Sequence, residues 1–392
     1  MDCFAAVMTG RGTGAIATIQ ILGDSAKDIL AKVFKPAGAK IQRCKTGQIL
    51  LGDIIDNDKT IDQVAIGCEA PGLFAIHCHG NPLIVEMIMQ RLKNSGATLL
   101  TAEQLRTKIL SAQEPKNTIV VEAKLAQLKA KTLLGTKIIA NQIGAGLSKT
   151  AIDWLENETS LDDIKTEADR ILQASQTAQL IIYGCTAVLT GPPNSGKSTL
   201  LNCLAGRQKA IVTDIKGTTR DWIEATCQID SLSLTLIDTA GLEDESDTPL
   251  DMIDEAAQRK TTEIIQQADL VLLVLDNSRP KEEFDAQIIE RASNKTIITI
   301  LNKFDLPSRF DTTRLPKTLS NAVKISAKNN TGIENLKQKI QQISGVANID
   351  PYQPICFTAR QENLLEQLKN TQSKQQTVSM IEELLKGQVQ TS

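Results

Sequence analysis

The sequence predicts a multidomain α/β protein with three parts: an N-terminal α+β domain, a helical domain, and an inserted domain built on a parallel sheet. Short Val, Ile and Leu runs alternate with helical segments between residues 184 and 346, which is typical of a parallel α/β sheet. Apolar residues recur at three- and four-residue spacing on both sides of this block, which indicates helices there. The 392 residues are also enough for two or three domains of about 150 residues each.

The first part of the chain mixes strand and helix patterns. Short β-like runs occur at Ala15–Leu22, Val64–Cys68 and Leu73–Cys78, and a strong helical pattern follows at Pro82–Lys93. This mixture predicts an α+β domain over residues 1–118.

Two helical stretches flank the parallel-sheet block. Residues 119–183 precede the block and residues 350–392 follow it, and we expect the two stretches to pack together as one helical domain. The inserted domain then covers residues 184–349.

Composition excludes several classes of function. The formal net charge of −3 rules out nucleic-acid binding by a strong global positive field, although a local basic patch is compatible with it. Aromatic residues make up 3% of the chain, which argues against a platform for base stacking. No apolar stretch reaches the roughly 20 residues of a membrane span, and the N-terminal segment lacks the pattern of a signal peptide. We therefore expect a cytoplasmic protein.

The cysteines and histidines do not form a recognisable metal site. None of the eight cysteines stands in a C-x-x-C pair, so we expect most of them to be small buried side chains in a reducing compartment. The two histidines, His77 and His79, alternate along a predicted strand and would share one face. Because no third ligand is recognisable nearby, a structural or turn role is favoured over metal binding.

A phosphate-binding loop is the sharpest motif. Residues 191–198 read GPPNSGKS and match the G-x-x-x-x-G-K-S pattern, between an apolar run and a helical stretch, as that motif requires. Backbone N–H groups of such a loop surround phosphates. We expect Lys197 to reach the β- and γ-phosphates and the Ser198 hydroxyl to ligate Mg²⁺. The residues assigned to this loop are Gly191, Asn194, Ser195, Gly196, Lys197, Ser198 and Thr199.

A second phosphate-facing motif ends the strand-like run 232–237. Its Asp238 carboxylate can hold Mg²⁺ through water, and the Gly241 N–H can turn toward a γ-phosphate. The residues assigned to this motif are Asp238, Thr239, Ala240 and Gly241.

Two further motifs predict the base. Asn302, Lys303 and Asp305 follow the apolar run 296–301, and the Asp305 carboxylate can accept hydrogen bonds from the ring N–H and amino group of guanine. Adenine lacks this donor pair, so the motif selects GTP over ATP. We expect the last strand to be closed by three residues that pack on the base: Ser326, Ala327 and Lys328. Four motifs in this order predict a Ras-like P-loop GTPase domain that binds GTP and GDP.

The segment 211–221, IVTDIKGTTRD, lies where a GTPase needs a mobile loop. Such a loop presents a threonine to Mg²⁺ and orders around the γ-phosphate. Arg220 is either an arginine finger acting within the chain or a solvated surface charge, and the residues leave both readings open.

The motifs together resemble one GTPase family. GPPNSGKSTLLNCLAGRQKAIVTDIKGTTRD followed by DTAGL is similar to the tRNA-modification GTPases of the MnmE (TrmE) family. GRGTGAIATIQILGDSA and IHCHGNPLIVEMIMQRL resemble the N-terminal strand motif and the His-Cys-His-Gly strand and helix of that family. These N-terminal motifs separate the MnmE family from the ribosome-assembly GTPases Era and Der, and the order helix, inserted GTPase, helix is also that of the family.

The resemblance implies specific cation sites and partners. Mg²⁺ ligands would be Ser198 and Thr219. K⁺ would pair two GTPase domains transiently and switch on hydrolysis, supplying the charge that an arginine finger otherwise brings. The resemblance also implies a homodimer through the N-terminal domain, with tRNA and a modification protein as partners. The implied K⁺ ligands are Asn194, Thr213, Ile215 and Thr218.

The family uses an acidic residue after DTAGL to orient the attacking water. Asp251, Asp254 and Glu255 are the candidates here, with Asp254 preferred. The implied catalytic set is therefore Asp254, Thr219 and Lys197.

The sequence departs from the family at its formyl-tetrahydrofolate site. Gln20 stands where the family has an arginine, and Ala75 stands where it has a glutamate. The family's lysine-bearing segment and its Cys-x-Gly-Lys terminus are not recognisable. Because charge-assisted hydrogen bonds supply much of such affinity, we predict weak or absent folate binding.

Three functions stay open from the sequence. The first is a K⁺-stimulated GTPase that forms half of a complex modifying the wobble uridine of tRNA. The second is an RNA- or ribosome-associated regulatory GTPase without modification activity, and the third is a GTP-binding regulatory module. The absence of a KH-type GXXG unit and of a second P-loop favours the first, whereas the missing folate anchors favour the others.

Overall fold

The computed structural model divides the chain into two compact units. The first comprises residues 1–125 together with 386–392, and the second comprises residues 126–385. The structure describes residues 2–389 except 11, 58, 115, 158, 207–222, 239–261, 281–294, 312–315, 317–318 and 320.

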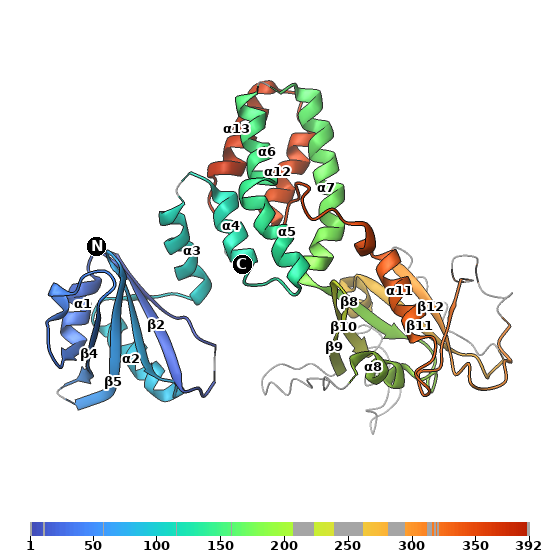
Figure 1. Cartoon of the computed structure of the whole chain (residues 1–392), viewed down its shortest axis with the longest axis horizontal. Coiled ribbons are helices and arrows are strands. Elements are labelled where there is room, and N and C mark those ends of the chain that lie inside the picture. The colour runs from blue at the N-terminus through green and yellow to red at the C-terminus, as the bar shows by residue number, and fades with distance from the viewer. Residues whose placement is uncertain are drawn as a thin grey trace. The chain divides into compact units, whose positions relative to one another are not determined.

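The first unit is built on a seven-stranded sheet with strand order β3-β4-β5-β6-β2-β1-β7 (Figure 1). Strand β7 pairs in parallel with β1, and the other neighbours run antiparallel. The core lies between the inward residues of this sheet and helices α1 and α2. The strands are β1 Cys3–Val7, β2 Ile16–Gly23, β3 Phe34–Pro36, β4 Ile49–Asp56, β5 Lys59–Ala70, β6 Leu73–His79 and β7 Thr98–Leu99; the helices are α1 Ala26–Val33, η1 Ile41–Arg43, α2 Pro82–Asn94, α3 Ala102–Gln113 and α4 Thr118–Ala126.

The predicted strands and helix of the N-terminal part are confirmed as β2, β5, β6 and α2. Helix α2 begins where the sequence indicates because Asn81 caps it and Pro82 occupies its first turn, where no N–H is needed. The Asn81 side chain accepts a hydrogen bond from the Leu83 N–H at 2.9 Å. Helix α3 begins with a capping box in which Thr101 and Gln104 exchange hydrogen bonds.

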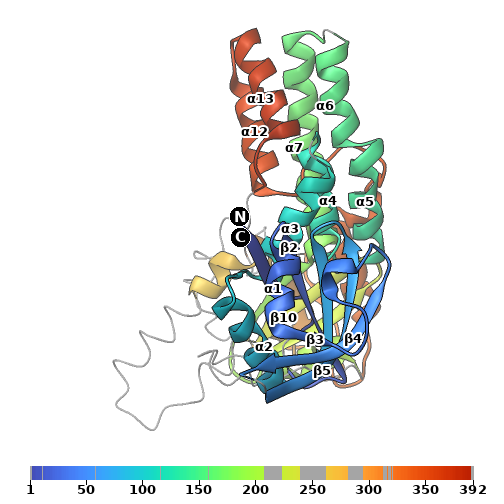
Figure 2. The same ribbon diagram turned by 90° about the vertical axis from the view of Figure 1, so that its left-hand side faces the viewer.

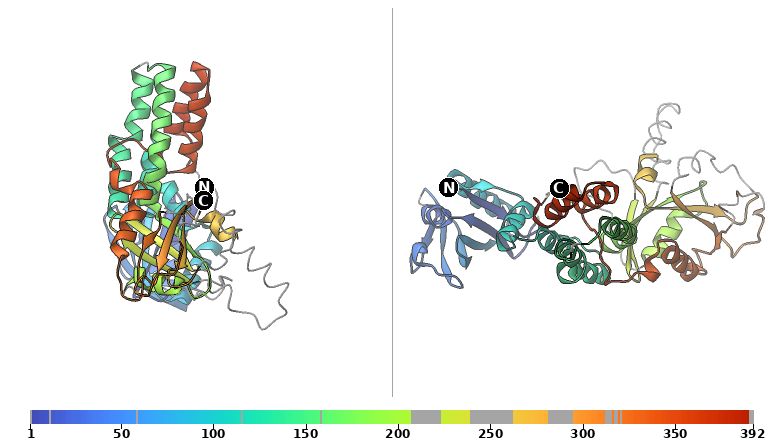
Figure 3. Two further views of the ribbon diagram at one scale, coloured as in Figure 1. Left: turned by 90° about the vertical axis from the view of Figure 1, so that its right-hand side faces the viewer. Right: turned by 90° about the horizontal axis from the view of Figure 1, so that it is seen from above.

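The helical part of the second unit joins segments that are far apart in sequence. Helix α12 lies beside α7 in each view (Figure 1, Figure 2 and Figure 3). The buried Gln142 side-chain oxygen accepts from the Ile355 N–H at 3.0 Å, and the Ser175 hydroxyl accepts from the Cys356 N–H at 2.8 Å. These hydrogen bonds join the helical stretch before the parallel-sheet block to the stretch after it. The helices are α5 Leu133–Gly144, α6 Leu147–Glu156, α7 Leu161–Tyr183, α12 Ala359–Asn370 and α13 Lys374–Lys386.

The remaining part of the second unit contains a six-stranded sheet with order β13-β12-β11-β8-β10-β9. Strand β9 is antiparallel to β10, and the other pairings are parallel, as predicted. The central strands are almost fully buried, which explains their continuous apolar runs. The elements are β8 Cys185–Thr190, α8 Lys197–Ala205, β9 Ile223–Ile229, β10 Leu232–Asp238, β11 Leu270–Asp276, β12 Thr296–Asn302, β13 Val323–Lys324, α11 Ile333–Ile343 and η5 Val346–Asn348.

One boundary differs from the prediction. Strand β13 ends at Lys324, so Ser326 does not close the strand. Ser326 instead forms an isolated bridge with Thr331, and its hydroxyl accepts from the Asn329 N–H at 3.2 Å. This local hydrogen bond favours a turn over continued strand pairing.

Two expectations from composition can be compared with the described residues. Seven of the eight cysteines are buried, and Cys203 is half-buried, which confirms their interior role. No helix in the described part of the chain is long and apolar enough to cross a membrane.

Candidate nucleotide site

The loop between β8 and α8 needs glycine at two positions. Gly191 and Gly196 have positive φ angles of 138° and 95°. A Cβ atom at Gly191 would lie 2.1 Å from the Val274 carbonyl oxygen, and one at Gly196 would lie 2.3 Å from the Asn302 side-chain nitrogen. Both the backbone conformation and the close packing therefore require glycine.

Lys197 and Ser198 lie at the first turn of α8. The Lys197 side chain is 3% exposed, and its Nζ donates to the Gly191 carbonyl at 2.8 Å and to the Pro192 carbonyl at 3.3 Å. The ammonium group thus lies inside the curve of the loop, where phosphates bind in this motif.

A hydroxyl and a carboxylate meet at the edge of the sheet. The Ser198 hydroxyl donates to Asp238 Oδ2 at 2.6 Å. Asp238 ends β10, which pairs in parallel with β8, so the carboxyl end of that strand reaches the same edge as the phosphate-binding loop. This pair of hard oxygen donors fits Mg²⁺, which binds proteins through few oxygen ligands and keeps several waters.

The buried Asn302 side chain joins the phosphate-binding loop to the base motif. Its nitrogen donates to the Ser195 carbonyl at 2.9 Å, and its oxygen accepts from the Ala327 N–H at 3.0 Å. Phe304 N–H also donates to the Ile325 carbonyl at 3.0 Å. Three motifs that are separated in sequence therefore converge on one side chain.

The Asp305 carboxylate is exposed and negatively charged. A hydrogen bond from Ser326 lowers the pKa of Asp305 below its ordinary value, and the nearby charges of Lys328 and Lys303 lower it further. An ionised carboxylate offers only acceptors, which matches the donor pair of guanine.

Family models match two parts of the chain, and similar proteins match most of its length. The family model described as "GTP-binding protein TrmE N-terminus" matches residues 3–104, and the model described as "50S ribosome-binding GTPase" matches residues 186–303. The chain is 30% identical over 379 residues to the tRNA modification GTPase MnmE of Clostridioides difficile, covering 87% of this chain and 82% of that protein. The MnmE of Lactiplantibacillus plantarum is 30% identical over 417 residues, covering 96% and 89%.

The chain belongs to the MnmE family. It is a multidomain P-loop GTPase that hydrolyses GTP. Among solved structures it is similar to the G domain of the T. maritima FeoB iron transporter, at 28% identity and a TM-score of 0.31, covering 40% of this chain and 97% of that one.

Several residues that the sequence motifs or the MnmE resemblance implicate lie outside the described part of the chain. They belong to the segment after α8 and to the segment after β10. These residues are Thr213, Ile215, Thr218, Thr219, Arg220, Thr239, Ala240, Gly241, Asp251, Asp254 and Glu255.

The family's folate position has a different set of side chains here. Gln20 on β2 lies opposite Ala75 on β6, and the Ala75 side chain is buried. The Gln20 side-chain nitrogen donates to Glu69 Oε2 at 2.6 Å, a contact that no local sequence pattern indicates. A neutral amide bonded to a carboxylate supplies no positive charge at this position.

Each histidine side chain has a protein partner. His77 Nδ1 lies 3.0 Å from the Thr18 hydroxyl. Asp62, 7% exposed, accepts from the His79 backbone N–H at 2.9 Å and lies 2.7 Å from its Nδ1 atom. Among the described residues, no group of three or more His, Cys, Asp and Glu side chains could hold a metal ion. These contacts give His79 a structural role at the last residue of β6.

Proposed function

We propose that this chain uses GTP hydrolysis to drive tRNA modification, with the nucleotide between the phosphate-binding loop and residues 302–305. Asn302 carries the proposal because its buried side chain bonds to both the Ser195 carbonyl and the Ala327 N–H. The relatives named tRNA modification GTPase MnmE span most of the chain and supply the RNA part of the proposal.

In this proposal, different residues bind different parts of the nucleotide. Lys197 binds the β- and γ-phosphates, Asp305 binds the guanine edge, and residues 326–328 pack on the base. Ser198 and Asp238 hold Mg²⁺, together with Thr219. When bound, Mg²⁺ neutralises charge on the phosphate oxygens.

Asn194 is the proposed protein ligand for K⁺. It is exposed at the tip of the loop, with a positive φ angle of 61°. Its side-chain oxygen is a hard ligand, and the loop sequence GPPNSGKS contains no arginine that could supply positive charge. Thr213, Ile215 and Thr218 would complete the site.

The K⁺ site is tested by turnover in two salts. We expect GTP turnover in K⁺ to exceed turnover in Na⁺ by tenfold or more at equal ionic strength, which is about 1.4 kcal/mol in the barrier. Asn194→Ala should remove the difference and leave nucleotide affinity largely intact. Asn202→Ala, an exposed asparagine on α8, is the matched control. Equal wild-type turnover in both salts would direct attention to Arg220.

Asp254 is the proposed group that orients the attacking water. Asp254→Asn should lower the turnover number without weakening GTP binding, because it removes an interaction made in the transition state. Asp251→Asn and Glu255→Gln serve as comparisons, and the largest loss among the three identifies the residue.

The role in tRNA modification is tested in cells. Cells that lack this gene should lose modification at the wobble uridine, and the wild-type gene should restore it, whereas Lys197→Ala should not.

We further propose that the chain forms a homodimer through the N-terminal unit, that its GTPase parts pair transiently, and that it binds a modification partner protein. Measurements of molecular size with GDP and with a GTP analogue would detect these assemblies.

A regulatory GTPase acting on RNA or the ribosome is the second candidate. The Gln20–Glu69 contact favours it, because this pair does not supply the cationic anchor of a folate site. Normal wobble-uridine modification combined with altered ribosome assembly in the deletion strain would establish this second function and exclude the first.

A further inference from the structure

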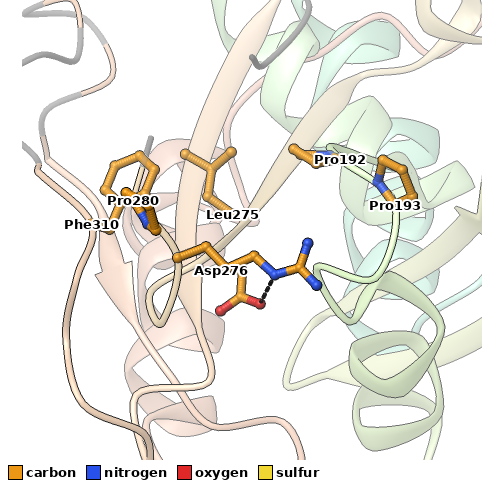
Figure 4. Close-up of a pocket in the computed structure, with 7 residues that line it drawn as sticks. Pro192, Pro193, Leu275, Asp276, Pro280 and Phe310 are labelled. Atoms are coloured by element: carbon orange, nitrogen blue, oxygen red, sulfur yellow. Dashed lines mark ion pairs between the residues drawn. The ribbon is translucent and has the colours of Figure 1, made fainter. Parts of the chain in front are cut away.

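Asp276 is a buried carboxylate beside the nucleotide site that none of the sequence motifs includes. It is the last residue of β11, and its side chain is 9% exposed. Oδ1 accepts from both the backbone N–H and the hydroxyl of Ser278, at 2.8 and 2.7 Å. Asp276 shares a small pocket with Pro192 and Pro193 of the phosphate-binding loop (Figure 4).

The second carboxylate oxygen of Asp276 holds Lys303. Lys303 Nζ lies 2.8 Å from Asp276 Oδ2, and the same Nζ donates to the Asn194 carbonyl at 2.6 Å. Asp276 lies opposite Asn302 in the parallel pairing of β11 with β12, which brings the carboxylate next to the base motif. One ammonium group therefore bridges the β11 end and the tip of the phosphate-binding loop.

We propose that Asp276 is a positioning residue for guanine-nucleotide binding, which holds the Lys303 ammonium on the Asn194 carbonyl before the nucleotide arrives. The inference rests on the proposed nucleotide site and deepens it. A lysine side chain has many rotamers, so fixing it in advance reduces the ordering cost of binding. The same contact holds Asn194 in a left-handed conformation that non-glycine residues seldom adopt.

The charge state of Asp276 agrees with this role. Burial raises the pKa of Asp276, but hydrogen bonds from Lys303 and Ser278 outweigh burial and lower the pKa below its ordinary value. The carboxylate is therefore ionised at neutral pH. Arg279, whose Nε atom lies 3.6 Å from Oδ2, is a more distant and more exposed partner.

The experiment is a double-mutant cycle read by the release of fluorescent GDP. Asp276→Asn keeps the shape and the Ser278 contacts but removes the charge, and we expect release to accelerate tenfold, about 1.4 kcal/mol. Lys303→Met should accelerate release at least as much. If Asp276 acts through Lys303, the double variant releases GDP within twofold of Lys303→Met. Effects that multiply in the double variant would overturn the proposal.

Two controls separate positioning from general loss of structure. Arg279→Gln removes the second charged partner of Asp276 and should change release by less than twofold. An effect equal to that of Asp276→Asn would overturn the proposal. Hydrogen exchange of residues 190–200 in the nucleotide-free protein should rise in Asp276→Asn and Lys303→Met alike. An exchange pattern unchanged from the wild type would also contradict it.

A milder variant covers the case in which Asp276→Asn does not fold. Ser278→Ala leaves the carboxylate but removes one of its hydrogen bonds, and it should accelerate release two- to threefold by the same route, so an unchanged rate would count against the proposal.

GDP binding by the wild-type protein distinguishes a failure of the nucleotide site from a failure of the role of Asp276. A wild-type protein that does not bind GDP would overturn the nucleotide site itself, whereas wild-type binding with additive variants overturns only the role of Asp276.

Discussion

The nucleotide site and the face of the N-terminal sheet that carries Gln20 are built in contrasting ways. At the nucleotide site, Asn302 and Lys303 each bond to the phosphate-binding loop, so the motifs are tied to one another before a ligand binds. At the N-terminal sheet, Gln20 bonds to Glu69 and faces the small, buried Ala75. The comparison shows that contacts between distant motifs are built into the nucleotide site, whereas the position expected to hold folate presents a neutral amide already bonded to a carboxylate.

The strongest test of the nucleotide site is the variant Lys197→Ala. Its ammonium is enclosed by the loop carbonyls of Gly191 and Pro192, so its removal takes away the charge nearest the transferred phosphoryl group. We expect GTP turnover, measured as phosphate release, to fall on the order of 1000-fold. Lys374→Ala, at the start of α13, should leave turnover unchanged. Turnover close to wild type would show that the loop does not hold the phosphates.

Base selection is the next largest effect. Asp305→Asn replaces two acceptors with a mixed amide, so GTP affinity should fall about 100-fold, by the loss of hydrogen bonds to a charged group. The preference for GTP over ATP should shrink accordingly, as measured by calorimetric titration of both nucleotides. Glu334→Gln, an exposed carboxylate on α11, is the control. Equal wild-type affinity for ATP and GTP would refute the guanine assignment.

Most of the nucleotide site could be predicted because its motifs are local. The sequence GPPNSGKS predicts a loop because its conformation requires glycine at Gly191 and Gly196, and the apolar run before it predicts the strand. Asp276 was missed although it ends the apolar run 270–275, because only strand pairing reveals that it lies beside Lys303. Its position at the carboxyl end of a parallel strand was the one available signal.

The N-terminal face could be predicted only in part, for a related physical reason. The strands that carry Gln20 and Ala75 were recognisable from their short β-like runs. The Gln20–Glu69 contact spans 49 residues of sequence and depends on a register shift between Cys68 and Ala70, which no local pattern reveals. The mobile-loop and catalytic-acid assignments stay predictions, since Thr219 and Asp254 lie outside the described residues.

His79 offers a test of whether the N-terminal motif serves structure. Asp62 binds both the backbone and the ring of His79, so Asp62→Ala should remove the carboxylate that accepts from the His79 N–H and contacts its ring. We expect the N-terminal unit to lose about 1–3 kcal/mol of stability in urea unfolding, with GTP turnover unchanged. Asp53→Ala, on the neighbouring strand β4, provides a comparison. A loss of turnover without a loss of stability would instead assign His79 to function.

The smallest effect is expected where the two regions differ most, at the folate position. Wild-type protein titrated with formyl-tetrahydrofolate in a calorimeter should give no measurable heat, because the Gln20 amide is neutral and bonded to Glu69. Gln20→Arg restores one cation, yet we expect less than a threefold gain in affinity. The new guanidinium would pair with the Glu69 carboxylate. Ala75 would still supply no negative charge at the position where the family has a glutamate. Gln20→Arg combined with Glu69→Gln frees that cation and should bind more tightly than either single variant. Tight, stoichiometric binding by the wild type would break the comparison, since the N-terminal unit would then hold its ligand through groups other than these three.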